Sequence, residues 1–256
     1  LVPFGPMLAW KRGDIAAAAE RLMAAFGIAL VAAAAAAFAM GATDILALAG
    51  IALAAWLMAG ALSETAFRIK LFQAPLAESF RRFVGLPRSA LGTALAHFGL
   101  GVTMLGLVAA TSWSSEDILT MKPGESVTVG GYQVTLEGFI PRPGPNYEEI
   151  AVRFLVRDGG VTVRTMEASK RNFATRATST TEAAIATFWP SQVYISLGDI
   201  ATDGATTVRL YWKSLATLIW LGAIVMALGG ALSLSDRRLR VGAPPPARKL
   251  AAVPAA

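Results

Sequence analysis

The chain has 256 residues, of which 55% are hydrophobic and only 16% charged, and its mean hydropathy is +0.54. Soluble domains carry roughly a quarter charged residues, so this composition excludes an ordinary soluble protein and indicates an integral membrane protein. The chain has no cysteine, which excludes disulfide bonds and thiol chemistry within it.

Four uncharged, apolar blocks each reach the roughly 20 residues that a helix needs to cross a bilayer. They cover residues 22–43, 45–63, 89–115 and 214–235. In lipid, a single segment can satisfy its own backbone N–H and C=O groups only as a helix. We therefore predict an α-helical integral membrane protein with about four transmembrane helices, the first two forming a hairpin over residues 16–63. Residues 1–15 are expected to be the end of a preceding segment and a cytoplasmic loop, in a chain that begins within a larger protein.

Lysine and arginine side chains flank these blocks at three places. They cluster within residues 11–21, 68–88 and 237–249. If the four helices alternate in direction across the membrane, all three clusters lie on the same side. The positive-inside rule identifies that side as cytoplasmic. This predicts a domain over residues 114–212 outside the cytoplasm, a last transmembrane helix over residues 213–235 and a cytoplasmic basic tail over residues 236–256. The net charge of +6 then indicates topology rather than nucleic-acid binding.

The cytoplasmic basic loop over residues 64–88 contains an amphipathic pattern. Its apolar members Phe72, Leu76, Phe80 and Phe83 recur at helical spacing, with Glu78, Arg81 and Arg82 elsewhere on the wheel. This pattern predicts a short helix in the membrane interface, with arginine side chains at the lipid headgroups. We favour an anchoring role for this helix over a regulatory one.

The predicted transmembrane helix over residues 89–113 carries His97, the only histidine in the chain. An ionisable side chain in such a segment is a functional-site candidate. Small residues on the same helix leave room for a second helix or a flat group to approach closely. They are Gly92, Ala96, Gly99 and Gly101.

Two interpretations of His97 stay open. It is either an axial ligand of a haem iron or a histidine hydrogen-bonded to a neighbouring helix. In the first case Met104 cannot supply the second axial ligand, because it lies about two turns away on the same helix. That second ligand must then come from another helix, outside this chain.

Residues 114–212 change to alternating patterning, which predicts a small all-β domain with a sandwich or barrel fold. Six strands are expected, over residues 126–129, 132–136, 150–156, 161–166, 192–197 and 206–212. The proline-rich residues 141–146 are expected to form a stiff loop outside any central strand. The basic residues 170–176 are interpreted as a solvated connection between strands, which we favour over contact with an anionic group or partner. Glu148 and Glu149 are interpreted as an isolated pair on a strand edge, so we assign no catalytic residue.

Several motifs, in order along nearly the whole chain, resemble the CcmF family of haem-handling membrane proteins in cytochrome c maturation. They are PFGPMLAWKR at residues 3–12, AHFGLG at 96–101, GPNY at 144–147, TEAAI at 181–185, IWLG at 219–222 and SDRR at 235–238. The predicted order of membrane spans and outer β domain also looks like the C-terminal part of that family.

The resemblance implies a subunit of a cytochrome c haem lyase in the bacterial inner membrane, with the β domain in the periplasm. His97 matches the family histidine that ligates a membrane-embedded haem b, which passes quinol-derived electrons to the haem delivered and ligated to apocytochrome c. The implied partners are a haem chaperone, a thiol-bearing lyase subunit, apocytochrome c, quinol, and the rest of the same protein or a split N-terminal subunit. The family's tryptophan-rich external segment and second haem histidine are absent here. The chain alone is therefore expected to hold half a haem site and no lyase site.

Two alternative functions stay open. A haem transporter would have repeated broken helices and a polar site near the bilayer midplane, whereas the sequence offers no internal repeat. A membrane scaffold would use its periplasmic β domain to recruit assembly partners.

Overall fold

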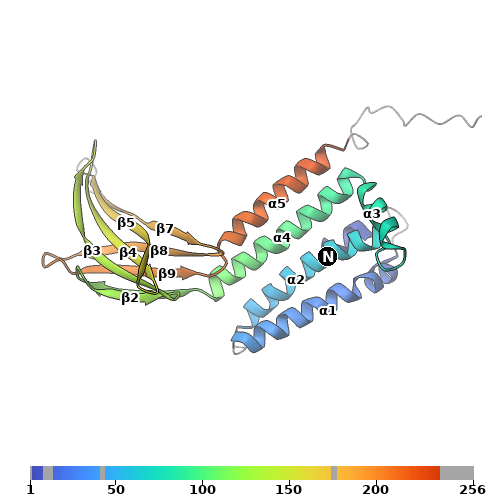
Figure 1. Cartoon of the computed structure of the whole chain (residues 1–256), viewed down its shortest axis with the longest axis horizontal. Helices are drawn as coiled ribbons and strands as arrows, with labels where there is room; N and C mark the ends of the chain where they lie inside the picture. The colour runs from blue at the N-terminus through green and yellow to red at the C-terminus, as the bar shows by residue number, and fades with distance from the viewer. Residues whose placement is uncertain (1, 8–13, 41–43, 174–177, 237–256) are drawn as a thin grey trace, which may run out of the picture.

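A computed structural model describes residues 2–7, 14–40, 44–173 and 178–236, which form a helical bundle and a β-sandwich (Figure 1). Four helices are long and apolar enough to cross a membrane: α1 (Ile15–Met40), α2 (Ile45–Arg68), α4 (Arg88–Ser112) and α5 (Thr217–Leu234). They pack as a row, α1 on α2, α2 on α4 and α4 on α5. A short 3₁₀ helix, η1 (Val2–Met7), lies against α2 and contributes the buried Pro3, which packs at Gly60.

Glycines at seven-residue spacing let α4 and α5 approach closely. A Cβ atom built on Gly99 would lie 2.7 Å from the carbonyl oxygen of Gly222, and one on Gly229 would lie 2.6 Å from the backbone nitrogen of Ala96. Gly92 likewise faces the backbone of α5 at Gly229. Packing through small residues is the usual way that helices associate in lipid, where burial of apolar surface gives no driving force.

At the end of the bundle next to the sandwich, Asp44 connects the start of α2 with the end of α4. Its carboxylate caps the start of α2, accepting hydrogen bonds from the N–H groups of Leu46 and Ala47 at 3.0 and 3.2 Å. The hydroxyl of Ser112, at the end of α4, donates to the other carboxylate oxygen at 3.4 Å. The hairpin residues 41–43 lie outside the described part of the chain.

At the opposite end, α5 supplies the cap of α4. Pro87 precedes α4 and makes no side-chain cap, while Asp236 accepts hydrogen bonds from the Ser89 N–H at 3.1 Å and the Ser89 hydroxyl at 2.8 Å. Asp236 is buried, and a carboxylate at a helix N-terminus also interacts favourably with the helix dipole. The cap therefore holds the end of α5 against the start of α4.

We expect Asp236→Ala to lower the free energy of unfolding by about 1–2 kcal/mol, because the start of α4 loses its acceptor. Asp236→Asn keeps one acceptor oxygen and should lose less. Thermal unfolding of the detergent-solubilised protein measures both. Asp14→Ala is the control, because it removes only an exposed local cap of α1. If Asp236→Ala lowers the stability no more than Asp14→Ala does, this role of Asp236 is contradicted.

Residues 115–213 form a sandwich of two antiparallel sheets. One sheet has the order β1 (Ser115–Met121), β9 (Thr206–Lys213), β8 (Ser191–Ile200), β7 (Ala184–Phe188). The other has the order β2 (Ser126–Val129), β3 (Tyr132–Pro143), β4 (Glu148–Asp158), β5 (Val161–Phe173), β6 (Thr178–Glu182). The core between the sheets is apolar, with Phe154, Leu136, Ile195 and Leu210 fully buried.

All six predicted strands are present, and three further strands were not predicted. β6 is exposed at every residue and β1 at most of them, so neither shows the alternation of a half-buried strand. β7 is only five residues long.

Two expectations for the sandwich were wrong. Residues 141–143 belong to β3 and pair with β4. β2 pairs only with residues 132–135, so the prolines lie where the other edge of β3 has no partner strand among the described residues. Proline is tolerated at such an edge because no ladder hydrogen bond is lost. Residues 170–173 lie within β5 rather than in a connection, and residues 174–176 fall outside the described part of the chain.

The predicted amphipathic helix is confirmed as α3 (Leu76–Val84), at the end of the bundle away from the sandwich (Figure 1). It begins directly after Pro75, so Phe72 precedes it rather than forming part of it. The side chains of Phe72, Leu76 and Phe80 are exposed, while Arg82 pairs with Glu78 at 2.6 Å.

Candidate functional site

His97 lies on α4, about 12 Å of helix rise from Ser89. Its side chain is half-buried, and within the described residues it makes no hydrogen bond or ion pair. The alternative of a histidine bonded across to a neighbouring helix therefore finds no partner in the part of the chain that the structure describes. The imidazole stands on an apolar helix with a nitrogen lone pair available to a ligand.

The small residues around His97 do not leave an open wall. Gly92 and Gly99 face the backbone of α5, and Gly101 faces α2, where an added Cβ would lie 2.9 Å from the carbonyl oxygen of Ala54. The expected room for a flat group on these faces is therefore filled by other helices of the same chain. A macrocycle held by His97 would have to lie on a different face of α4.

That face is marked by residues that follow His97 at helical spacing. Leu100 and Leu107 are exposed, at 37% and 49%, and Met104 lies between them. Met104 and Leu107 also line a mostly apolar groove of about 410 Å³ between α2 and α4, which runs to Asp44 at the sandwich end. An apolar surface thus continues from His97 along α4 into this groove.

The described residues hold no group of three or more His, Cys, Asp or Glu side chains that could bind a metal ion together. His97 itself can offer one coordinate bond to a metal ion.

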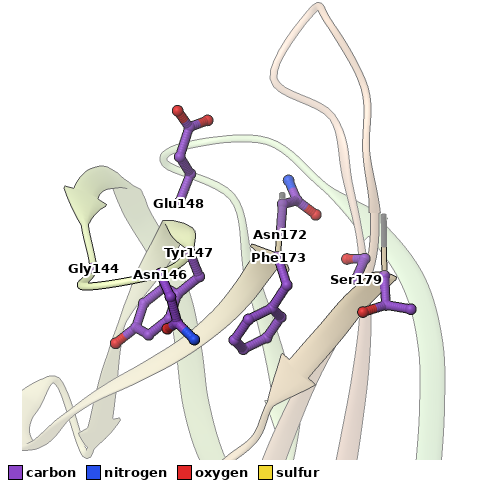
Figure 2. Close-up of a pocket in the computed structure, with 8 residues that line it drawn as sticks. Gly144, Asn146, Tyr147, Glu148, Asn172, Phe173 and Ser179 are labelled. Carbon is purple, nitrogen blue, oxygen red and sulfur yellow. The ribbon is translucent and has the colours of Figure 1, made fainter. Parts of the chain in front are cut away.

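A second hollow, of about 680 Å³, lies at one end of the sandwich (Figure 2). Its lining residues are Gly144, Asn146, Tyr147, Glu148, Asn172, Phe173, Thr178 and Ser179. The rings of Tyr147 and Phe173 lie 5.4 Å apart between centroids, and the Arg171 guanidinium lies 4.8 Å from the centroid of Tyr147. The GPNY motif thus forms part of a surface lined by aromatic rings and side-chain amides.

Beside this hollow, Glu149 is the centre of a polar network, not an isolated group on an edge. It lies on β4, between β3 and β5, and its side chain is only 12% exposed. It accepts hydrogen bonds from the Ser169 hydroxyl at 2.5 Å and from Arg171 at 3.2 Å. The bond from Ser169, helped by Arg171, holds the pKa of Glu149 below its ordinary value despite burial. Sequence reasoning missed the network because its members come from different strands.

We expect Glu149→Gln to destabilise the protein by about 1 kcal/mol at pH 7. Because the folded-state pKa of Glu149 is below the unfolded value of about 4.3, its contribution is present above that value and is lost as the pH falls through the folded pKa. Melting temperatures of the wild type and the variant should therefore converge in acid. Glu148→Gln, at the exposed neighbour, is the control; an equal loss there would contradict the prediction.

Over its described residues, the structure thus defines a membrane protein in which a sandwich of nine strands is inserted between two of four membrane-capable helices. The family model of the CcmF C-terminal beta-sandwich matches residues 112–214. The cytochrome c-type biogenesis protein CycK of Rhizobium meliloti is 50% identical over 99% of this chain, and CycK of Bradyrhizobium diazoefficiens is 52% identical over 96%. The chain belongs to the CcmF family of cytochrome c-type biogenesis proteins and corresponds to its C-terminal part.

The chain spans 37% of the length of each of these two relatives. CcmF of Escherichia coli is 34% identical over 75% of this chain. A solved cytochrome c haem lyase CcmF has the same fold, with a TM-score of 0.69 over 91% of this chain and 37% of its own, at 16% identity.

Proposed function

We propose that this chain is the C-terminal part of a haem lyase subunit that binds haem b in the membrane through His97. In that role it helps to deliver reduced haem to apocytochrome c and to ligate it there. The observation that carries the proposal is His97 itself, an imidazole without a partner among the described residues, on an apolar helix of a cytochrome c biogenesis protein.

The residues around His97 fit such a group. Neutral imidazole is a common axial ligand of haem iron, and the apolar face at Leu100 and Met104 suits a porphyrin plane. A bound haem would supply one-electron chemistry. His97 would be one of the groups that hold the haem, the α4 face would exclude water, and a second ligand would come from outside this chain.

We also propose how the chain lies in the bacterial inner membrane. The sandwich would lie in the periplasm, and the C-terminal tail in the cytoplasm, as the basic clusters favour. The exposed apolar face of α3 would then rest in the cytoplasmic lipid interface and anchor the loop between α2 and α4. The partners would be the rest of the protein or a separate N-terminal subunit, a haem chaperone, a thiol-bearing lyase subunit, apocytochrome c and quinol.

A replacement experiment tests the proposed function. The corresponding part of CycK in Rhizobium meliloti is exchanged for this chain, and c-type cytochromes are detected by haem staining of membrane proteins. We expect the chimera to restore them. A chimera that is inserted at the normal level and yields no holocytochrome would contradict the proposal.

The transporter alternative is not favoured by the helices. Transporter sites are built from discontinuous helices, whereas α1, α2, α4 and α5 each run without a break through the described residues.

A further inference from the structure

Two strand edges in the sandwich have no partner where the chain crosses from one sheet to the other. β6 pairs with β5 only over residues 169–173, so residues 161–168 of β5 have one edge without a strand among the described residues. β7 pairs with β8 alone, and its second edge is also open in that part of the chain. The chain passes from β6 to β7 at Ala183, which leaves the two open edges close together.

A cleft of about 440 Å³ lies between these edges. Its walls are residues 164–167 of β5 and residues 184–187 of β7, and we call it the β5–β7 cleft. β7 ends beside the bundle, because the Thr217 hydroxyl, at the start of α5, donates to the Pro190 carbonyl at 2.6 Å. Within the sandwich, the ring of Phe188 at the end of β7 lies 4.4 Å from the ring of Tyr132 between centroids. The cleft is therefore on the side of the sandwich that adjoins the membrane-capable helices.

The β7 wall of the cleft lacks the usual protection of an open edge. Natural edge strands are blunted by proline, bulges or charges. Residues 184–188 contain no proline, no charged residue and no register shift, whereas the β5 wall carries Arg164 and Glu167 and begins beside the register shift between Val156 and Arg157. Ile185 is 61% exposed on the β7 wall. Such edges present rows of backbone donors and acceptors that an added extended strand can satisfy.

The cleft also carries a cation that has no counter-ion in the part of the chain that the structure describes. Glu167 is held by Arg142 at 2.8 Å and by Arg153 at 3.0 Å, so its charge is already neutralised. Arg164 is exposed and makes no ion pair with the described residues. The charge complement of the cleft is therefore an acidic side chain.

We propose that the β5–β7 cleft binds an extended, acidic segment of an unfolded polypeptide as an added β-strand, with an acidic side chain on Arg164. An unfolded segment is the best match because all its backbone donors and acceptors can pair, whereas a helix satisfies its own and a folded partner would have to offer an open strand edge. The identification of the bound chain as a protein substrate rests on the proposed function in cytochrome c maturation, whereas strand addition itself does not.

Site-specific cross-linking with the detergent-solubilised full chain tests the location. The photoreactive residue p-benzoylphenylalanine replaces Ile185 in one variant and Ile118 in the control. Ile118 is 57% exposed on β1, the opposite edge strand of the same sheet. The probe is a fluorescein-labelled Thr/Val peptide of about 10 residues with two glutamates, a length typical of a strand. We expect cross-links at position 185 and not at 118; equal cross-linking would overturn the proposal.

Backbone methylation tests the binding mode. Two forms of the probe carry N-methyl groups on alternate residues, in the two possible phases, so each loses the donors along one edge. At least one form should bind about tenfold more weakly than the parent peptide, since several backbone hydrogen bonds are lost. Parent-like binding of both forms would overturn strand addition.

Charge reversal tests the specificity. Arg164→Glu should weaken binding of the glutamate peptide about fivefold and should not weaken binding of a lysine version. Arg164→Gln should show a smaller loss, and unchanged binding of the glutamate peptide to both variants would overturn the role of Arg164. The haem spectrum of the complete protein reports the proposed function separately, so a protein without substitutions that shows the spectrum and fails to bind the peptide would overturn this inference alone.

Discussion

Gly229→Val is expected to disrupt the packing of α4 on α5, whereas Gly230→Val, one residue along, is expected to leave it intact. A Cβ at Gly229 would lie 2.6 Å from the backbone nitrogen of Ala96 and 2.6 Å from the carbonyl oxygen of Gly92. Backbone atoms cannot rotate aside, so the two helices must separate. No atom of another described element lies within 4 Å of a Cβ built on Gly230. We expect a loss of about 3 kcal/mol at position 229.

The pair is matched because both substitutions place valine in α5 and change helix propensity equally. Thermal unfolding in detergent, followed by size-exclusion chromatography, measures the difference. Gly222→Val should resemble Gly229→Val, since its Cβ would meet the carbonyl oxygen of Gly99 at 2.5 Å. Equal melting temperatures for the variants at 229 and 230 would show that α4 and α5 do not pack through these glycines.

His97→Ala in the complete protein is expected to abolish or sharply weaken the low-spin b-type haem spectrum. Removal of a residue that only hydrogen-bonds to a metal ligand already lowers metal affinity about 10–100-fold. Loss of the ligand itself should therefore lower haem occupancy by at least about tenfold. Absorbance of the purified protein, normalised to protein concentration, measures the occupancy. An unchanged spectrum would remove His97 from the ligand set.

Two further measurements separate ligation from packing in this variant. Imidazole added to His97→Ala should restore part of the spectrum, which a purely structural defect would not allow. Met104→Leu keeps the apolar face of α4 and removes its sulfur, so its spectrum should stay close to that of the wild type. A loss in Met104→Leu equal to that in His97→Ala would contradict the assignment of His97 as the ligand from this helix.

The parts of the fold that could be predicted depend on residues close together in sequence. Each transmembrane helix follows from one apolar block, and the β2–β3 hairpin follows from two alternating runs around Gly130 and Gly131. His97 stood out for the same reason, since a single ionisable group in an apolar block is visible without knowledge of the fold.

The remaining features depend on partners distant in sequence. Asp236 caps α4 through Ser89, 147 positions earlier, and Lys170 pairs with Asp199 at 2.9 Å across 29 positions. The glycines near His97 illustrate the same limit. Their spacing shows that something packs closely, but only the folded chain shows that α5 and α2 occupy that space.

The pairing of β1 with β9 has a mechanical consequence. Ser115 and Trp212 are partners in this pair, and they lie just beyond the end of α4 and just before the start of α5. The Ser214 hydroxyl also donates to the Trp113 carbonyl at 2.6 Å, so no loose linker separates the sandwich from the two helices. The sandwich is therefore joined to α4 and α5 through paired chain segments. We expect a partner that tilts the sandwich to move the ends of these two helices with it, and so to reach the helix that carries His97.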